Sequence, residues 1–143
     1  MNEPNPVMSV DELNAFLLAV FPQANVGGPD FRVLSVEPGR VAIRMKTDSS
    51  HLRPGGTVSG PTIFTLCDVA GYACALSHIG PEALAVTTNL NLNFMRKADP
   101  GTLECSARIL KLGKRLMVFD AEVTSEGSMI AHATGTYALP PKV

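Results

Sequence analysis

Hydrophobic residues occupy nearly every side of the segment from Pro61 to Ile79, a pattern that predicts a buried helix. Ser59 precedes the segment as a candidate N-cap, and Pro61 suits the first turn, where a missing N–H costs nothing. Gly80 is typical of the position just past a helix end. The segment carries one acid, Asp68. A carboxylate within so apolar an element is costly unless it has a partner or a purpose, so Asp68 is a candidate functional residue.

Alternating apolar and polar positions predict strands on both sides of this helix. Residues 31–47 suit two short strands around the turn Glu37-Pro38-Gly39. From Thr88 the alternation is clean, with Leu90, Leu92 and Phe94 on one face and three asparagines on the other. Three more strands are predicted at Thr102–Leu110, Leu116–Val123 and Met129–Ala138. We therefore expect an α+β fold in which an antiparallel sheet curls round one long central helix.

The 143 residues suit a single domain, 1–143, in which residues 1–30 form an N-terminal extension. A capping box beginning at Ser9 predicts a short amphipathic helix within this extension. The formal net charge of −1 argues against nucleic acid or an anionic membrane as the main partner. The cysteines show no metal-binding or disulfide spacing, and the first residues lack the features of a signal peptide, so we expect a cytoplasmic protein.

Two motifs together resemble the hot-dog-fold acyl-CoA thioesterases, in particular the PaaI-like branch. The first is Gly55-Gly56-Thr57-Val58-Ser59-Gly60 opening a helix that contains Asp68-Val69-Ala70-Gly71, and the second is the asparagine-rich strand 86–94. The usual family motif is His-Gly-Gly, with the catalytic acid nine residues after the His. That register sets Ser59, Gly60 and Pro61 at the three motif positions and Asp68 at the acid. The resemblance implies a hot-dog fold, an obligate homo-oligomer (a dimer or a dimer of dimers) with shared active sites, and hydrolysis of an acyl thioester.

The reaction needs an oxyanion donor and a base or nucleophile. The Gly60 N–H lies at the positive end of the helix dipole and can donate to an oxyanion. Asp68 can activate water as a general base, or attack the carbonyl and form an anhydride. Eight residues separate the two, which is roughly 12 Å along a helix that rises about 1.5 Å per residue. One helix therefore cannot bring both groups to one carbonyl, and we expect Gly60 to come from the partner subunit.

Other candidate residues follow from the same register. Thr87 occupies a position where the family often has a hydroxyl that positions the attacking water. The alternation sets Thr87 on the asparagine face, so it can reach the site only if the strand twists or bulges there. Ser59 replaces the usual His and can cap the helix but cannot carry a positive charge. Arg53 occupies a position where relatives often carry Asn near the thioester, and Arg53, Ser59 and Pro61 are candidate substrate contacts.

Substrate contacts are expected from two groups of residues. Basic side chains at turns can bind the phosphates of coenzyme A, which belongs to the substrate, so no separate cofactor is expected. Apolar side chains of the helix can line the groove for the acyl chain. The candidates are Arg96, Lys97, Lys111, Lys114 and Arg115 for the phosphates, and Phe64, Leu66, Val69 and Tyr72 for the groove.

Two other functions remain open from the sequence. A hot-dog dehydratase or hydratase would act on 3-hydroxyacyl thioesters, but such relatives pair a catalytic His with an acid, and no His lies between Ser59 and Asp68. A non-catalytic acyl-CoA binding protein is the second. His51, His78 and His132 are dispersed along the chain, so no metal site is predicted. Release of free thiol separates a hydrolase from both alternatives.

Overall fold

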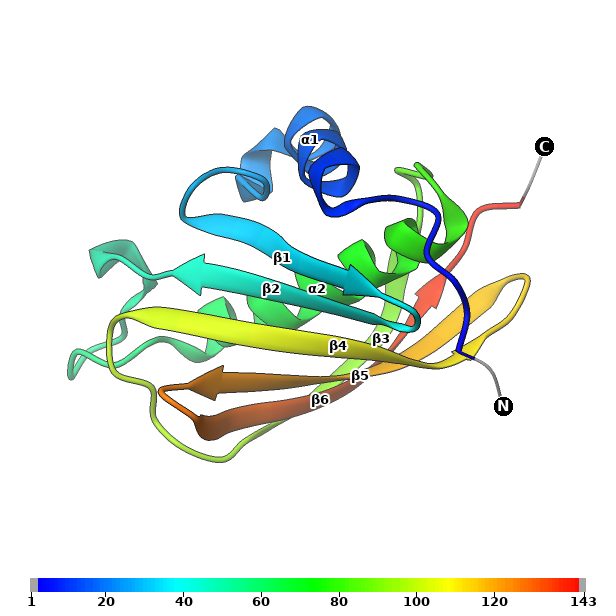
Figure 1. The fold of residues 1–143 in the computed structure, drawn as a ribbon. Helices are drawn as coiled ribbons and strands as arrows, with labels where there is room; N and C mark the ends of the chain where they lie inside the picture. Colours follow the sequence, from blue (N-terminus) through cyan, green and yellow to red (C-terminus); the bar gives the residue numbers. More distant parts are fainter. Residues whose placement is uncertain (1–2, 142–143) are drawn as a thin grey trace.

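The structure, a computed structural model, describes residues 3–141 and consists of a six-stranded sheet folded round one helix (Figure 1). The elements in chain order are α1 (Val10–Val20), the 3-10 turn η1 (Pro22–Ala24), β1 (Phe31–Glu37), β2 (Arg40–Lys46), η2 (Ser49–His51), α2 (Gly60–Ile79), β3 (Val86–Phe94), β4 (Thr102–Leu112), β5 (Leu116–Ser125) and β6 (Ser128–Ala138). The expected hot-dog architecture is confirmed.

Helix α2 has the limits that its end residues predict. The Ser59 side chain accepts a hydrogen bond from the Thr62 N–H, and the Gly80 N–H bonds back to the Leu76 carbonyl. Of the described residues, α2 alone has the length and composition of a membrane-spanning helix, and 72% of its most apolar stretch is buried within the fold. The C-terminal half is buried on every side, from Val69 to His78.

The N-terminal half of α2 departs from the prediction of a helix buried all round. Pro61, Phe64 and Thr65 are exposed, and Asp68 is half-buried on the same side of the helix. These positions follow the i, i+3, i+4, i+7 spacing of one helix face. We call this face, Pro61, Phe64, Thr65 and Asp68, the open face of α2. The sheet therefore covers most of α2 but leaves this one face uncovered within the chain.

The sheet is antiparallel throughout, in the order β1-β2-β4-β5-β6-β3. Its two edge strands differ in what covers them. The free edge of β1 is met by α1, because the Asn14 amide accepts from the Val33 N–H at 2.9 Å and donates to the Val33 carbonyl at 3.0 Å. Strand β3 pairs only with β6 among the described residues, and most of its side chains are exposed. An uncovered edge of this length is a template for pairing with another chain.

The core lies between α2 and the concave face of the sheet, and Phe119 of β5 is at its centre with no exposed surface. Cys67, Cys74 and Cys105 are all free and buried, as expected for small core residues. Burial raises the pKa of the Cys74 thiol to about 12, so this group stays protonated and unreactive.

Candidate active site

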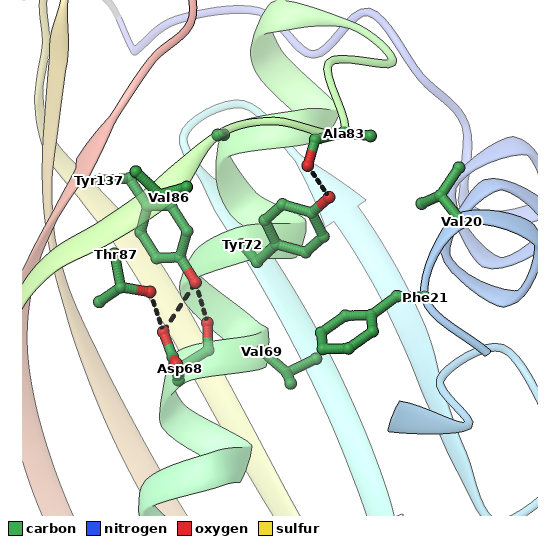
Figure 2. A pocket seen from close by; sticks show the side chains of 10 residues that line it. Val20, Phe21, Asp68, Val69, Tyr72, Ala83, Val86, Thr87 and Tyr137 are labelled. Atoms are coloured by element: carbon green, nitrogen blue, oxygen red, sulfur yellow. Dashed lines mark hydrogen bonds between the residues drawn. The ribbon is translucent and has the colours of Figure 1, made fainter. Parts of the chain in front are cut away.

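Two hydroxyl groups hold the carboxylate of Asp68 (Figure 2). Thr87 Oγ1 donates to Asp68 Oδ1 at 2.6 Å, and the Tyr137 hydroxyl donates to the same oxygen at 2.7 Å. The Tyr137 hydroxyl also lies 2.8 Å from the Asp68 backbone carbonyl. Within residues 3–141, no group donates to the second oxygen, Oδ2. One carboxylate oxygen is thus fixed by two donors while the other is free to react.

Thr87 reaches Asp68 because β3 bulges there, which is one of the two distortions that the sequence left open. The pairing of β3 with β6 shifts between Thr87 and Asn89, so Thr88 is the extra residue. A bulge changes the face on which the following side chains lie. Thr87 therefore points to α2, while Asn89, Asn91 and Asn93 are exposed. The structure thus brings Thr87 to Asp68, and a role for Thr87 in catalysis stays a prediction.

Tyr137 is the site residue that the sequence analysis missed. Strand pairing sets Tyr137 directly opposite Thr87 in the β3–β6 register. Its ring is 3% exposed and stacks on Tyr72 at 6.0 Å between centroids. Burial, together with the Asp68 charge, raises the pKa of Tyr137 well above its usual value, so the hydroxyl remains a donor. The sequence does hold one signal for this residue: a Tyr at an inward position of the last strand needs a hydrogen-bond partner for its hydroxyl.

A cavity of about 440 Å³ opens beside the Asp68 carboxylate. Phe21 contacts Tyr72 edge to face with centroids 6.3 Å apart, and the Tyr72 hydroxyl donates to the Ala83 carbonyl at 2.7 Å, which fixes the loop after α2. The lining residues are Val20, Phe21, Asp68, Val69, Tyr72, Ala83, Ala85, Val86, Thr87 and Tyr137 (Figure 2). The N-terminal extension thus supplies part of a mainly apolar wall.

The start of α2 lies in a different cavity, of about 350 Å³. Gly60 lines it together with Phe94 from the far end of β3 and the basic residues Arg53, Arg96 and Lys97. Asp68 does not line this cavity, and Gly60 does not line the cavity of Asp68. The chain therefore keeps the two groups apart, as the spacing along the helix predicts.

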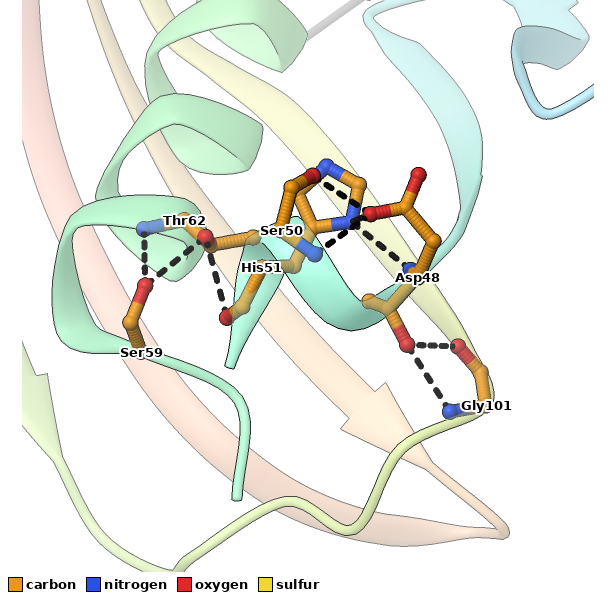
Figure 3. Close-up of polar contacts among 7 residues, drawn as sticks. Asp48, Ser50, His51, Ser59, Thr62 and Gly101 are labelled. Atoms are coloured by element: carbon orange, nitrogen blue, oxygen red, sulfur yellow. Dashed lines mark hydrogen bonds and ion pairs between the residues drawn. The ribbon is translucent and has the colours of Figure 1, made fainter. Parts of the chain in front are cut away.

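The Gly60 N–H donates to no acceptor within residues 3–141, so it is free to donate to a substrate oxygen. The neighbouring polar groups are occupied instead with holding the helix end (Figure 3). The Ser59 N–H donates to the His51 carbonyl at 2.8 Å, and the Ser59 hydroxyl lies 2.8 Å from that of Thr62. Ser59 therefore acts as the helix cap, and its contact with substrate stays a prediction.

The remaining candidates lie in four places: a third cavity, the open face of α2, the wall of the Asp68 cavity and the core. Lys114 and Arg115 line a third cavity, of about 650 Å³, at the turn between β4 and β5. Pro61 and Phe64 belong to the open face of α2, and Phe64 is 41% exposed. Of the four groove candidates, Val69 and Tyr72 line the Asp68 cavity, whereas Leu66 is fully buried in the core.

None of the three histidines lines the Asp68 cavity. His78 is buried and accepts from the Gly39 N–H at 2.9 Å, and His132 lies 3.2 Å from Asp120 in β5. His51 accepts from the Asp48 N–H through Nδ1 at 2.9 Å. In the part of the chain that the structure describes, no three His, Cys, Asp or Glu side chains are grouped as metal ligands.

Comparisons of the sequence and of the structure with known proteins agree on one family for this chain. Residues 55–132 match the thioesterase superfamily. A "putative thioesterase" from Silicibacter sp. TM1040 is 46% identical and superimposes with a TM-score of 0.86, covering 97% of this chain and 96% of that one. Protein smu.793 of Streptococcus mutans, bound to acetyl CoA, is 29% identical with a TM-score of 0.71 over 78% of this chain and 90% of that one. The phenylacetic acid degradation protein PaaI of Thermus thermophilus, 24% identical over 88% of this chain and 99% of that one, shares the fold with a TM-score of 0.71.

Proposed function

Because this chain belongs to the thioesterase superfamily, we propose that it hydrolyses an acyl-CoA thioester to a free acid and coenzyme A, with Asp68 at the reacting centre. The observation that carries the proposal is the Asp68 carboxylate, held through one oxygen at the edge of a mainly apolar cavity. The acetyl CoA bound to the related Streptococcus mutans protein supports coenzyme A as the thiol part of the substrate.

Asp68 acts on the thioester carbonyl in one of two ways. As a general base it removes a proton from water, and the resulting hydroxide attacks the carbonyl carbon. As a nucleophile it attacks the carbonyl carbon, the C–S bond breaks and the coenzyme A thiolate leaves, and water then hydrolyses the resulting anhydride. In both cases the carbonyl oxygen gains negative charge and needs a fixed donor. The unpaired Gly60 N–H at the helix N-terminus supplies that donor.

A second copy of the chain brings Gly60 to Asp68. Along the edge strand β3, Thr87 contacts Asp68, while Phe94 near the other end contacts Gly60, with the phenyl Cζ 3.7 Å from where a Cβ would stand. Antiparallel pairing of β3 with its copy, about a two-fold axis near the middle of the strand, brings Phe94 of the partner subunit close to Thr87. The partner's Gly60 then approaches Asp68, and the dimer has two equivalent sites.

This dimer also covers what the single chain leaves open. It pairs the free edge of β3 and brings the open faces of the two α2 helices toward each other. The basic side chains Arg53 and Arg96 come with Gly60 to the mouth of the partner's Asp68 cavity, where they meet the coenzyme A phosphates. Lys114 and Arg115 lie in a separate cavity and are the weaker candidates for this contact.

The histidine positions favour hydrolysis over the dehydratase alternative. Dehydration of a 3-hydroxyacyl thioester requires a base and an acid at adjacent carbons of the substrate, and no His lines the Asp68 cavity to join the carboxylate. A binding protein without activity would not need a carboxylate with one free oxygen in its ligand cavity.

The first experiment measures thiol release from phenylacetyl-, benzoyl-, hexanoyl-, lauroyl- and palmitoyl-CoA by the wild-type protein and by Asp68→Asn. The amide has the shape of the carboxylate and can still accept from Tyr137 and Thr87, so the variant should fold. We expect turnover to fall by at least about a hundredfold. Absence of thiol release from every substrate, or an active Asp68→Asn variant, would contradict the proposal.

Subunit complementation tests the shared site. Gly60→Pro removes the N–H, and Gly60→Ala, which retains it and has room for its Cβ, is the matched control. Mixed dimers of Asp68→Asn and Gly60→Pro contain one site with both native groups and one with neither. Random exchange of equal amounts should restore about a quarter of wild-type activity. If heterodimers form, as native mass spectrometry can show, and activity stays absent while both variants are folded, the shared site is wrong.

A further inference from the structure

The geometry points to Tyr137 as a positioning residue that, with Thr87, fixes Oδ1 of Asp68 and thereby assigns Oδ2 as the oxygen that reacts. This inference rests on the proposed function and specifies how the carboxylate is held. Both hydroxyls donate to Oδ1, at 2.6 and 2.7 Å, and no donor within residues 3–141 reaches Oδ2.

Packing and a second hydrogen bond hold the Tyr137 hydroxyl beside Oδ1 of Asp68. The Tyr137 ring packs against the rings of Tyr72 and Phe119, with centroids 6.0 Å from each, and these contacts restrict movement of the hydroxyl. The same hydroxyl lies 2.8 Å from the backbone carbonyl of Asp68, which ties the side chain to the helix turn that carries it. A phenol has one proton, so the two acceptors share it in a three-centre hydrogen bond.

Two donors on one oxygen restrict the carboxylate more than one donor does. A single hydrogen bond fixes a distance but still permits rotation about the Cβ–Cγ bond. Thr87 approaches from β3 and Tyr137 from β6, so together they fix the plane of the carboxylate. A fixed plane directs the free lone pairs of Oδ2 at one point in the cavity, which is the condition for efficient attack or proton transfer.

The two oxygens therefore have separate roles. Oδ1 accepts the two hydroxyl protons and serves as the anchor. Oδ2 removes the proton from water or forms the bond to the acyl carbon. Tyr137 does not need to touch the reacting atoms for this role, since it acts through Asp68.

Steady-state kinetics of Tyr137→Phe, Thr87→Val and the double variant test this role. Tyr137→Phe keeps the buried ring and removes one hydrogen bond to a charged group, so kcat should fall by about ten- to a hundredfold while KM changes by less than about twofold. Because losing either donor already frees the carboxylate, the double variant should lose clearly less than the product of the two single losses. Thr88→Val is the matched control, because the Thr88 hydroxyl bonds to the Thr136 carbonyl and should not affect kcat.

Combination with Asp68→Asn separates positioning from a general structural effect. Once the carboxylate is gone, Tyr137→Phe should not change the residual rate further. A folded Tyr137→Phe enzyme with kcat within twofold of wild type, or losses that multiply in the double variant, would overturn the assignment.

An NMR measurement keeps this test distinct from that of the proposed function. With 13C-labelled aspartate, the Asp68 carboxyl resonance is identified by its absence in Asp68→Asn. This resonance should shift in Tyr137→Phe and in Thr87→Val but not in Thr88→Val. An unshifted resonance overturns the positioning role even if the wild-type protein releases no thiol. Absence of thiol release by itself overturns the proposed function and with it the role of Oδ2.

Discussion

Replacing Gly71 by Ala in the middle of α2 should destabilise the protein, although alanine is the better helix former. On intrinsic propensity alone the change would stabilise the helix by about 0.5–1 kcal/mol. Gly71 lies one turn after Asp68, and its backbone packs directly on the Phe119 ring. A Cβ at position 71 would lie 2.8 Å from both Cε atoms of that ring and closer still to Cζ. Ordinary carbon contacts are about 3.5–4.0 Å, so the ring would have to withdraw by more than about 1 Å.

The ring has little room to withdraw, because its Cε1 and Cζ atoms also pack on the backbone of Gly135 in β6. A Cβ on Gly135 would itself lie 2.7 and 2.8 Å from Phe119 carbons. Overpacking of a core costs about 1–3 kcal/mol, and a ring held between two backbones should be near the upper limit. Subtracting the propensity gain leaves a net destabilisation of about 2–2.5 kcal/mol. The displaced helix should also weaken the Tyr137–Asp68 contact and lower kcat.

Urea unfolding at a fixed protein concentration measures this change in the free energy of unfolding. The double variant Gly71→Ala/Phe119→Leu provides the control, because the smaller side chain gives the new methyl group space. Its loss of stability should be smaller than the sum of the two single losses. A Gly71→Ala protein as stable as wild type, or more stable, would refute the argument that the backbones of Gly71 and Gly135 confine the ring.

Two further predictions concern the acyl cavity and the pH dependence of stability. Phe21→Ala removes part of the cavity wall and leaves more room for a long acyl chain. The ratio of kcat/KM for lauroyl-CoA to that for hexanoyl-CoA should therefore rise by about tenfold. Leu18 lies outside the cavity, so Leu18→Ala should leave this ratio unchanged. Burial lowers the pKa of His78 below its usual value, against the smaller opposing effects of the Cys74 carbonyl, the Glu37 backbone and Glu3. His78 therefore binds a proton more readily in the unfolded chain than in the folded one. Its neutral form contributes fully to the stability of the fold above about pH 6.5, and this contribution is lost as the pH falls toward the pKa that His78 has in the folded protein. The drop in Tm between pH 7.5 and 5.5 should be smaller in His78→Gln, and equal drops would contradict the role of His78.

Local signals in the sequence determined the elements and their order. Ser59, Pro61 and Gly80 set the limits of α2, because capping depends on residues adjacent to the helix ends. The Glu37-Pro38-Gly39 turn and the alternation after Thr88 set the strands, whose observed bounds differ by at most two residues in β4, β5 and β6. The separation of Gly60 from Asp68 also followed from the sequence, since it depends only on the rise of a helix.

Only the tertiary structure decided how Asp68 is held and which face of α2 stays open. Tyr137 is 69 residues from Asp68 along the chain, and their contact depends on β6 pairing with β3 and on the bulge that turns Thr87 inward. The wall formed by Phe21 likewise depends on Asn14 docking α1 against β1. Periodicity shows which residues avoid water but not which distant element covers them, because that choice is made by packing between segments far apart in the sequence.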